Sequence, residues 1–102
     1  TRELLSLPER PTAIFAASDL IAIAALSVIY EYGLKVPSDI AIIGINNIDI
    51  TAYTSPPLST IDVHAREMGR IAADLLLSRI NGDTSMPKSI YLPTKLIVRG
   101  SV

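Results

Sequence analysis

Four small polar residues are the part of this sequence best suited to chemistry. Ser18 and Asp19 follow an apolar run at residues 14–16, and Asn46 and Asn47 follow a second apolar run at residues 40–45. Their hydroxyl, carboxyl and amide groups are short hydrogen-bond donors and acceptors, which suit the hydroxyl groups of a sugar. These residues therefore indicate a binding site for a small polar molecule.

The same residues also have structural interpretations. Asp19 can cap the start of a helix, and an Asn-Asn pair commonly forms a turn. For Asp19 the cap is favoured over contact with a ligand. For Asn46 ligand contact is favoured, because this residue leaves its strand where open parallel sheets bind their ligands.

The elements that must position these residues are two strands and the helix between them. Residues 14–16 and 40–45 contain no charge, and an unbroken apolar run is typical of a strand covered on both faces. A helix is predicted over residues 19–32, capped by Ser18 or Asp19 and ended by Gly33. Parallel strands joined by a helix bring equivalent ends to one edge of the sheet, so the polar pairs should lie side by side.

The predicted helix is unusually apolar. Residues 20–30 contain no charge, and the hydroxyl groups of Ser27 and Tyr30 are their only polar side-chain groups. A helix on the outside of a sheet needs only one apolar stripe. Two interpretations remain open, because the pattern reports burial without its cause: the helix is covered by its own domain, or its outer face meets a second subunit.

No enzyme or metal site is indicated. His64 is the only histidine and the chain has no cysteine, so a metal site has little support. The serines lack a Gly-x-Ser-x-Gly elbow, and the glycines form neither a phosphate loop nor a dinucleotide fingerprint. Asp49 and Asp62 are not spaced as a catalytic pair. No cofactor is expected.

The composition is what we expect of a fragment of a larger protein. The 102 residues are 49% hydrophobic and 19% charged, with a mean hydropathy of +0.41, which is apolar for so small a chain. The chain also opens on what looks like the end of a helix, so we expect a truncated protein. The net charge is −1 and the lysine and arginine residues are not clustered, so this segment should not bind nucleic acid by electrostatic attraction. No apolar run could span a membrane and no signal peptide is visible.

The second half of the chain is more polar. Residues 48–57 are expected to be irregular with at most one short turn, and residues 58–61 to be extended. A second helix is predicted from about residue 62 to 81, where Arg70 and Asp74 can pair on the solvated side. Short strands are predicted at residues 90–92 and 96–98, on either side of Pro93.

Five segments resemble the lactose/galactose repressor (LacI/GalR) family of bacterial transcription regulators. The similarity covers nearly the whole chain from residue 11 onward. The order and spacing of the segments carry it: Pro-Thr-Ala-Ile-Phe-Ala-Ala-Ser-Asp at 11–19, Gly-Leu-Lys-Val-Pro-Ser-Asp-Ile-Ala-Ile-Ile-Gly at 33–44, Ser-Pro-Pro-Leu-Ser-Thr-Ile at 55–61, Glu-Met-Gly-Arg at 67–70 and Leu-Pro-Thr-Lys-Leu-Ile-Val-Arg-Gly-Ser at 92–101.

The resemblance implies an α/β, parallel-sheet, periplasmic-binding-protein-like (type I) core, of which this chain is a C-terminal fragment. In that core two subdomains enclose an effector cleft. Residues 1–61 would be part of the C-terminal subdomain, residues 62–88 a helix of the N-terminal subdomain, and residues 89–102 the strands that return.

The resemblance also implies residue roles and partners. A small-molecule effector, expected to be a sugar, would contact Ser18, Asp19 and Asn46. A homodimer would form through positions that include Ile23, Ser27, Tyr53 and Thr54, which favours the subunit-contact interpretation of the apolar helix. Operator DNA would be bound only through an N-terminal domain that is absent here. Such a repressor is not an enzyme, needs no membrane and is cytoplasmic.

Two positions depart from the family pattern. Ser18 stands where the family usually has Asn, and Asn46 where it usually has an Asp that holds effector hydroxyls. Charge-assisted hydrogen bonds contribute about 1.5–3 kcal/mol against about 0.5–1.5 for neutral ones, so the effector is expected to be unusual or more weakly held. The alternatives are the C-terminal part of an exported sugar-binding protein of an ABC transporter, and a carbohydrate or nucleotide enzyme with an α/β fold.

Overall fold

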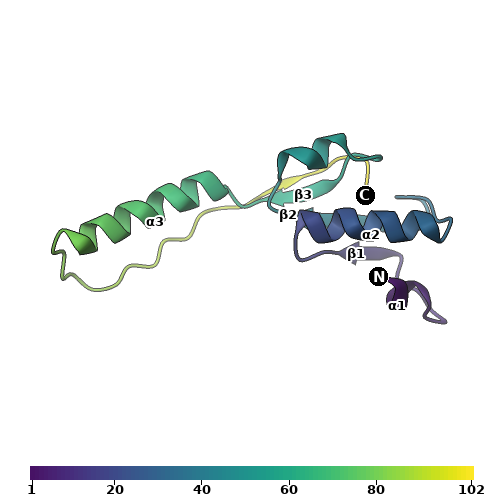
Figure 1. Ribbon diagram of the computed structural model, residues 1–102, viewed down its shortest axis with the longest axis horizontal. Helices are drawn as coiled ribbons and strands as arrows, with labels where there is room; N and C mark the ends of the chain where they lie inside the picture. The colour runs from purple at the N-terminus through teal and green to yellow at the C-terminus, as the bar shows by residue number, and fades with distance from the viewer.

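The computed structural model describes residues 1–102 as alternating short helices and strands (Figure 1). In chain order they are α1 (Arg2–Leu5), β1 (Ala13–Phe15), α2 (Asp19–Glu31), β2 (Ala41–Ile45), the 3-10 helix η1 (Asp49–Tyr53), β3 (Ser59–Asp62), α3 (Ala65–Ile80) and β4 (Lys95–Ile97). The short turn expected within residues 48–57 is η1. The expected strand at residues 90–92 is wrong, because only the segment after Pro93 pairs with the sheet.

The strands form one sheet in the order β1-β2-β3-β4. The first three are parallel, with Phe15 opposite Ile43 and Ile45 opposite Ile61, whereas β4 runs antiparallel to β3. This arrangement confirms the prediction that β1 and β2 end at the same edge. The α/β fold class is also confirmed, as a mixed sheet in which β1, β2 and β3 are parallel and the edge strand β4 is antiparallel.

The helix α2 covers one face of this sheet. It begins at Ser18, whose hydroxyl oxygen accepts a hydrogen bond from the N–H of Ile21 at 3.3 Å, and the chain leaves it through Gly33 in the left-handed region at φ +71°. Its buried face repeats at helical spacing and packs on the buried strand residues: Ala22, Ala25, Leu26 and Ile29 against Ile40 and Ile42.

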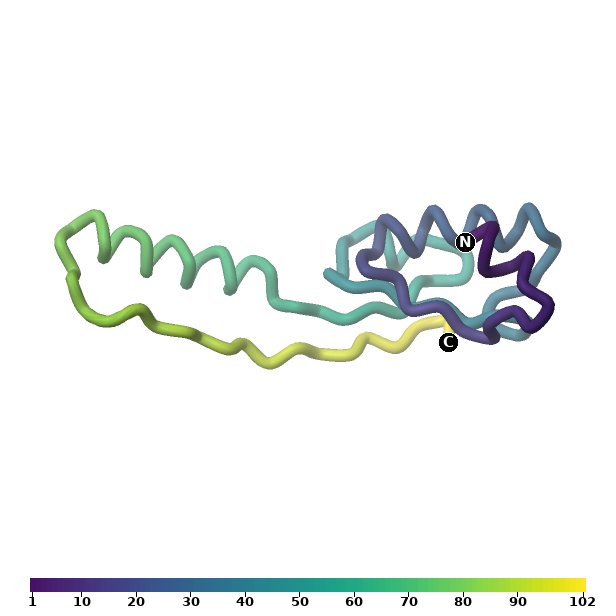
Figure 2. The backbone as a smooth tube through the Cα atoms, turned by 90° about the horizontal axis from the view of Figure 1, so that it is seen from below, coloured from purple at the N-terminus to yellow at the C-terminus, as the bar shows by residue number.

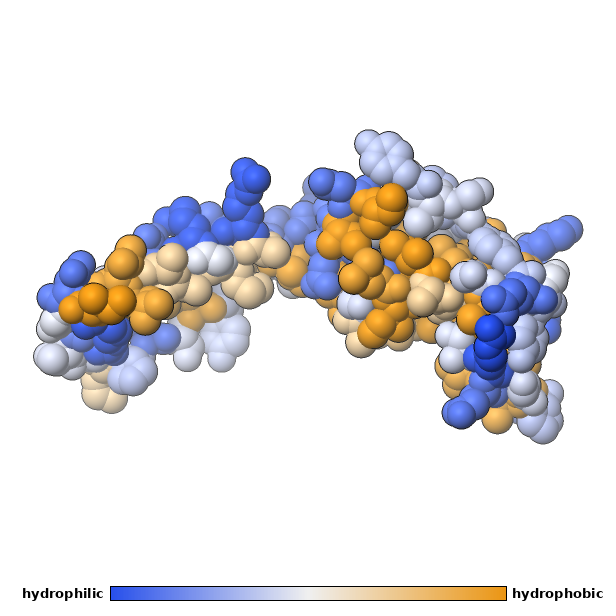
Figure 3. All heavy atoms as spheres, viewed as in Figure 1, coloured by the Kyte–Doolittle hydropathy of each residue, from blue (hydrophilic) through white to orange (hydrophobic).

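The opposite face of α2 is apolar and uncovered in this chain. Leu20 is 68% exposed and Ile21 is 54% exposed, and Ala24 and Ser27 are exposed as well. Figure 3 shows apolar residues gathered over this part of the molecule. No part of residues 1–102 covers this face, so both interpretations stay open: cover by the rest of the domain, or contact with a second subunit.

The molecule divides into a head and an arm. The head consists of residues 1–62 and 95–102 and holds the sheet, α2 and both chain ends, while the arm of residues 63–94 points away from it (Figure 1). The radius of gyration is 18.2 Å and the extents are 58 × 27 × 18 Å. A compact chain of this length would have a radius of gyration of about 13 Å, so the arm lacks the surroundings of a folded core.

The arm consists of α3 and a return segment that runs back beside it (Figure 2). No residue of α3 is buried. Its apolar side faces the return segment across a hollow of about 370 Å³, lined mainly by Val63, Met68, Ile71, Ala72, Leu75, Ile90, Tyr91 and Leu92. On its solvated side Arg70 donates to Asp74 at 2.8 Å, as expected.

Candidate functional site

A hollow at the carboxyl edge of the sheet is lined by Asn46 and Asn47, the polar end of β2, whereas Ser18 and Asp19 at the end of β1 are not among its lining residues. It measures about 390 Å³ and lies where the head meets the start of the arm. Its lining is almost entirely polar: Asn46, Asn47, Asp62, His64, Ala65, Arg66 and Glu67. A hollow of this chemistry favours a small hydroxylated ligand over an apolar one.

The loop after β2 presents Asn46 to this hollow. Asn46 has φ +110° and Asn47 has φ +50°, so two consecutive residues with side chains occupy the left-handed half of backbone space. Such residues cost of the order of 1–3 kcal/mol each and persist only where their surroundings hold them. Asn46 is exposed. Its N–H donates to the carbonyl of Ile61 at 2.8 Å, and the side-chain hydrogen bonds that hold the loop come from its neighbours.

Asp19 holds that loop through a hydrogen bond to its backbone. It is completely buried, its Oδ1 accepts a hydrogen bond from Thr60 Oγ1 at 2.5 Å, and its Oδ2 accepts one from the N–H of Ile48 at 2.9 Å. The prediction that Asp19 caps α2 is wrong, because the hydroxyl of Ser18 does so. Contact between Asp19 and a ligand stays a prediction, and both of its oxygens already accept bonds within the chain.

Gly44 makes room for Asp19. A Cβ at this position would lie 2.3 Å from Asp19 Oδ1 and 3.0 Å from its Cα, too close for either atom. We expect Gly44→Ala to destabilise the protein by about 1–3 kcal/mol, the range for overpacking a core. A thermal melt would measure this, with Gly69→Ala as the control because nothing lies within 4 Å of a Cβ there. Equal effects of the two variants would contradict the close contact.

Asn47 joins the loop to two other segments. Its N–H donates to Thr60 Oγ1 at 3.2 Å, its Nδ2 donates to Asp62 Oδ2 at 3.3 Å, and its Oδ1 accepts from Arg99 Nη2 at 2.9 Å. From the sequence, Asn47 was expected either as part of a turn or as a polar group at the ligand edge. The structure makes it the centre of a hydrogen-bond network.

Sequence reasoning missed Arg99 altogether. Its guanidinium Nη1 donates to the carbonyl of Leu58 at 2.7 Å and to Thr51 Oγ1 at 3.1 Å, and its backbone N–H donates to Ser59 Oγ at 2.8 Å. The available signal was a single cation directly after the apolar residues 96–98. That local pattern does not indicate the hydrogen-bond partners of Arg99, which lie 40 or more residues away in the sequence.

Asp62 and His64 mark the point where the chain leaves the head. His64 has φ +52°, and its N–H donates to Asp62 Oδ1 at 2.8 Å while its Nδ1 lies 3.5 Å from the same oxygen. The N–H of His64 and the amide of Asn47 lower the pKa of the Asp62 carboxyl below its ordinary value. No group of three or more His, Cys, Asp or Glu residues is placed to hold a metal ion.

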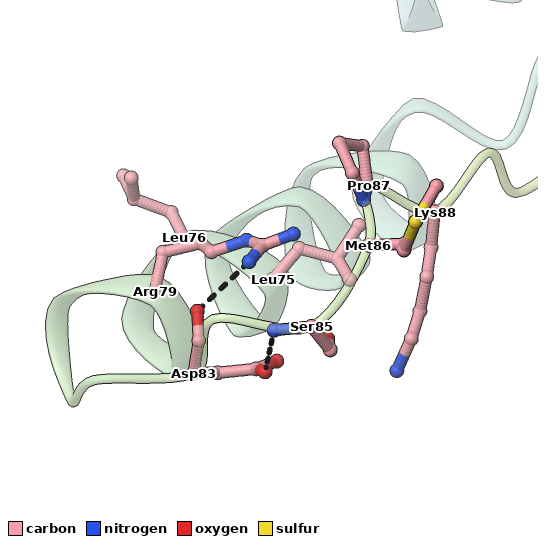
Figure 4. Close-up of a pocket in the computed structure, with 8 residues that line it drawn as sticks. All are labelled: Leu75, Leu76, Arg79, Asp83, Ser85, Met86, Pro87 and Lys88. Atoms are coloured by element: carbon pink, nitrogen blue, oxygen red, sulfur yellow. Dashed lines mark hydrogen bonds between the residues drawn. The ribbon is translucent and has the colours of Figure 1, made fainter.

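A second hollow lies at the tip of the arm and has a different character. It measures about 410 Å³ and is bounded by α3 and the turn that follows it (Figure 4). Arg79 Nη1 donates to the carbonyl of Asp83 at 2.8 Å, and Asp83 Oδ1 accepts from the N–H of Ser85 at 2.8 Å. These polar groups close the turn, and none of the predicted ligand residues lines this hollow.

Two of the four predicted interface residues lie on or at the border of the uncovered face of α2, and the other two lie at the end of η1. Ser27 is exposed on that face, and half-buried Ile23 lies at its border. Tyr53 is 82% exposed on η1. Thr54 is half-buried, and its hydroxyl donates to the carbonyl of Pro56 at 2.8 Å. Their role in dimer contact stays a prediction.

Comparisons with known proteins identify relatives over the whole chain. The profile of a family described as "Periplasmic binding protein-like domain" matches residues 1–102. The HTH-type transcriptional repressor CytR of Escherichia coli (strain K12) is 46% identical over 100 residues, which cover 98% of this chain and 29% of the repressor. This chain thus spans about three tenths of the length of that curated relative.

Solved structures give the same result. A LacI family transcriptional regulator from Enterococcus faecalis V583, with bound ribose, superposes with a TM-score of 0.88 at 39% identity, covering 98% of this chain and 37% of that one. The lac repressor dimer bound to operator and the anti-inducer ONPF superposes with a TM-score of 0.79 at 33% identity, covering 89% of this chain and 32% of that one. None of the helices in the present structure is long and apolar enough to cross a membrane.

Proposed function

This chain belongs to the periplasmic binding protein-like domain family, and we propose on that premise that it is the C-terminal part of the effector-sensing core of a LacI/GalR-type transcriptional repressor. The observation that carries the proposal is the placement of Ser18 and Asn46 at the ends of neighbouring parallel strands, at an edge with a polar hollow. The similarity over 98% of the chain to a transcriptional repressor supports it.

The proposed effector is a sugar or a molecule that contains one. Asn46 lines the hollow with an exposed amide, which can donate one hydrogen bond and accept another from vicinal hydroxyls. Ser18 Oγ accepts the helix-capping bond and keeps its own proton for donation. The solved relative with bound ribose supports this ligand class.

The head and the arm are proposed to belong to two subdomains that face each other across the effector. The head would be part of the C-terminal subdomain and α3 part of the N-terminal one, connected by β3 and the segment that leads into β4. An arm without a buried helical residue needs such a second lobe around it. The effector would act by binding the closed and open arrangements unequally, since equal binding shifts no equilibrium.

The complete protein is proposed to act as a cytoplasmic homodimer that binds operator DNA through a separate N-terminal domain. The uncovered face of α2 and the exposed Tyr53 supply an apolar surface for the second subunit. The relatives named above are transcription regulators, which favours this function over an exported transport protein or an enzyme.

The decisive experiment uses the full-length protein and random duplex DNA. Immobilised protein should retain a DNA pool that becomes enriched in a two-fold symmetric sequence, because a symmetric dimer reads two half-sites. Retention should then change when sugars, beginning with D-ribose, are added. If no sequence is enriched over several rounds, the repressor function is wrong.

Asn46 is proposed to contact the effector, and its removal tests that role. In the full-length protein Asn46→Ala should weaken sugar binding by about tenfold, since one or two hydrogen bonds of about 0.5–1.5 kcal/mol each are lost. Calorimetry with the tightest-binding sugar measures the change, and the melting temperature should hardly move because the side chain is exposed. Unchanged affinity would remove Asn46 from the cleft.

A further inference from the structure

The Asn47 side chain bonds a cation and an anion at the same time. Its Oδ1 accepts from the guanidinium of Arg99 at 2.9 Å, and its Nδ2 donates to the carboxylate of Asp62 at 3.3 Å. An amide can do this because it carries both an acceptor and donors. A carboxylate in its place would keep the bond to Arg99 but would face Asp62 with a like charge.

Its two partners come from the two segments that cross between the head and the arm. Asp62 is the last residue of β3, where the chain leaves the head, and it pairs in the sheet with Lys95, where the chain returns along β4. Arg99 follows shortly after β4 and bonds the head at Leu58 and Thr51. The Asn47 side chain therefore connects the loop after β2 to both of the segments that cross between the head and the arm, which we call the crossings.

The same loop carries Asn46, which shares a peptide unit with Asn47. Both residues have positive φ, so the direction of the Asn46 side chain depends on a backbone conformation that side chains disfavour. The N–H of Asn46 donates to the carbonyl of Ile61 at 2.8 Å and the N–H of Ile48 donates to Asp19 Oδ2 at 2.9 Å, so the backbone of the loop is held on both sides. The side-chain bonds of Asn47 add the restraint between them, and their loss should let the loop relax and change the direction of the Asn46 side chain.

We propose that Asn47 is a positioning residue of the effector site, which fixes Asn46 and links it to the crossings through Arg99 and Asp62. The proposal rests on the proposed effector role of Asn46 for its functional meaning. Its structural part concerns this loop alone, and it can be tested without any ligand.

A charge swap in the full-length protein provides the test. Asn47→Asp should make the amides of residues 46–48 exchange with deuterium about tenfold faster, the factor for losing one hydrogen bond to a charged group. Adding Asp62→Asn should restore slow exchange, because the new amide at 62 can donate to the new carboxylate at 47. Asp62→Asn alone should have a smaller effect, since an amide oxygen remains to accept from Asn47.

The controls separate positioning from general destabilisation. Asn81→Asp makes the same chemical change at the exposed end of α3 and should leave exchange at residues 46–48 unaltered. Exchange within α2 should also stay unchanged in every variant. The proposal is overturned if Asn47→Asp leaves the loop unaffected, or if the double variant exchanges faster than either single one.

Calorimetry with D-ribose then addresses the functional part. Affinity should fall in Asn47→Asp and return in the double variant, parallel to the exchange rates. If exchange follows the swap while affinity for a bound sugar does not, Asn47 only stabilises the loop and its role in the effector site is wrong. If D-ribose fails to bind the unmodified protein, the exchange measurements still decide the loop mechanism, and the failure counts against ribose as the effector.

Discussion

Ala24→Asp should convert the proposed dimer of the full-length protein into a monomer. Ala24 lies at the centre of the uncovered apolar face of α2 and is exposed in this chain, so an aspartate there costs the folded subunit little. In a symmetric dimer the same patch is buried on both subunits, so two unpaired charges would be enclosed. An uncompensated buried charge costs about 3–5 kcal/mol, so the two together should raise the dissociation constant by a factor of about ten thousand or more.

Sedimentation velocity over a range of concentrations measures this change, and circular dichroism checks that the subunit stays folded. Ala73→Asp is the matched control, because Ala73 is exposed on α3 between the charged residues Arg70 and Asp74. This variant should remain dimeric. A dimer that tolerates Ala24→Asp would show that this face is covered by another part of the same polypeptide.

Asp19→Ala should lower the free energy of unfolding of the full-length protein by about 2–5 kcal/mol. The substitution leaves the N–H of Ile48 and the hydroxyl of Thr60 without their acceptor, and each unsatisfied buried group costs about 1–3 kcal/mol. Urea unfolding followed by circular dichroism measures the loss. Sugar affinity should fall as well, because the loop that carries Asn46 loses its support.

Ser18→Ala is the informative companion to that variant. Within the chain it removes only the hydrogen bond that caps α2, and it should lower the free energy of unfolding by about 1 kcal/mol. The expected loss of unfolding free energy is thus smaller for the helix cap than for the buried carboxylate of Asp19. If Asp19→Ala destabilises the protein no more than Ser18→Ala does, the buried hydrogen bonds of Asp19 carry no net stability.

The strand–helix–strand unit was predictable because its signals are local. The uncharged runs, the left-handed Gly33 and the polar strand ends each act within a few residues, and the structure places β1, α2 and β2 at or within a residue or two of the expected bounds. That β1 and β2 end at the same edge of the sheet followed from the connection of two parallel strands by a helix. The strand predicted at residues 90–92 was wrong because local signals do not supply a pairing partner. Its local pattern suits a strand, but no neighbouring strand is there to pair with it.

The supports of the site could not be predicted in this way. Whether Ser18 or Asp19 caps α2 depends on which side chain finds another partner, and Asp19 finds Thr60 across 41 residues. Arg99 and Asn47 are separated by 52 residues. Only folding brings such groups together, because a hydrogen bond between distant residues leaves no period or spacing in the sequence.

By itself, the sequence determined the order of the elements, the edge at which Ser18 and Asn46 emerge, and the apolar character of α2. Tertiary structure decided which polar residues hold the site through long-range hydrogen bonds and how the loop after β2 is fixed. It also decided that one face of α2 is exposed in this chain. The physical reason is that apolar periodicity and backbone preference are properties of neighbouring residues, whereas satisfaction of a buried polar group depends on whatever the fold places beside it.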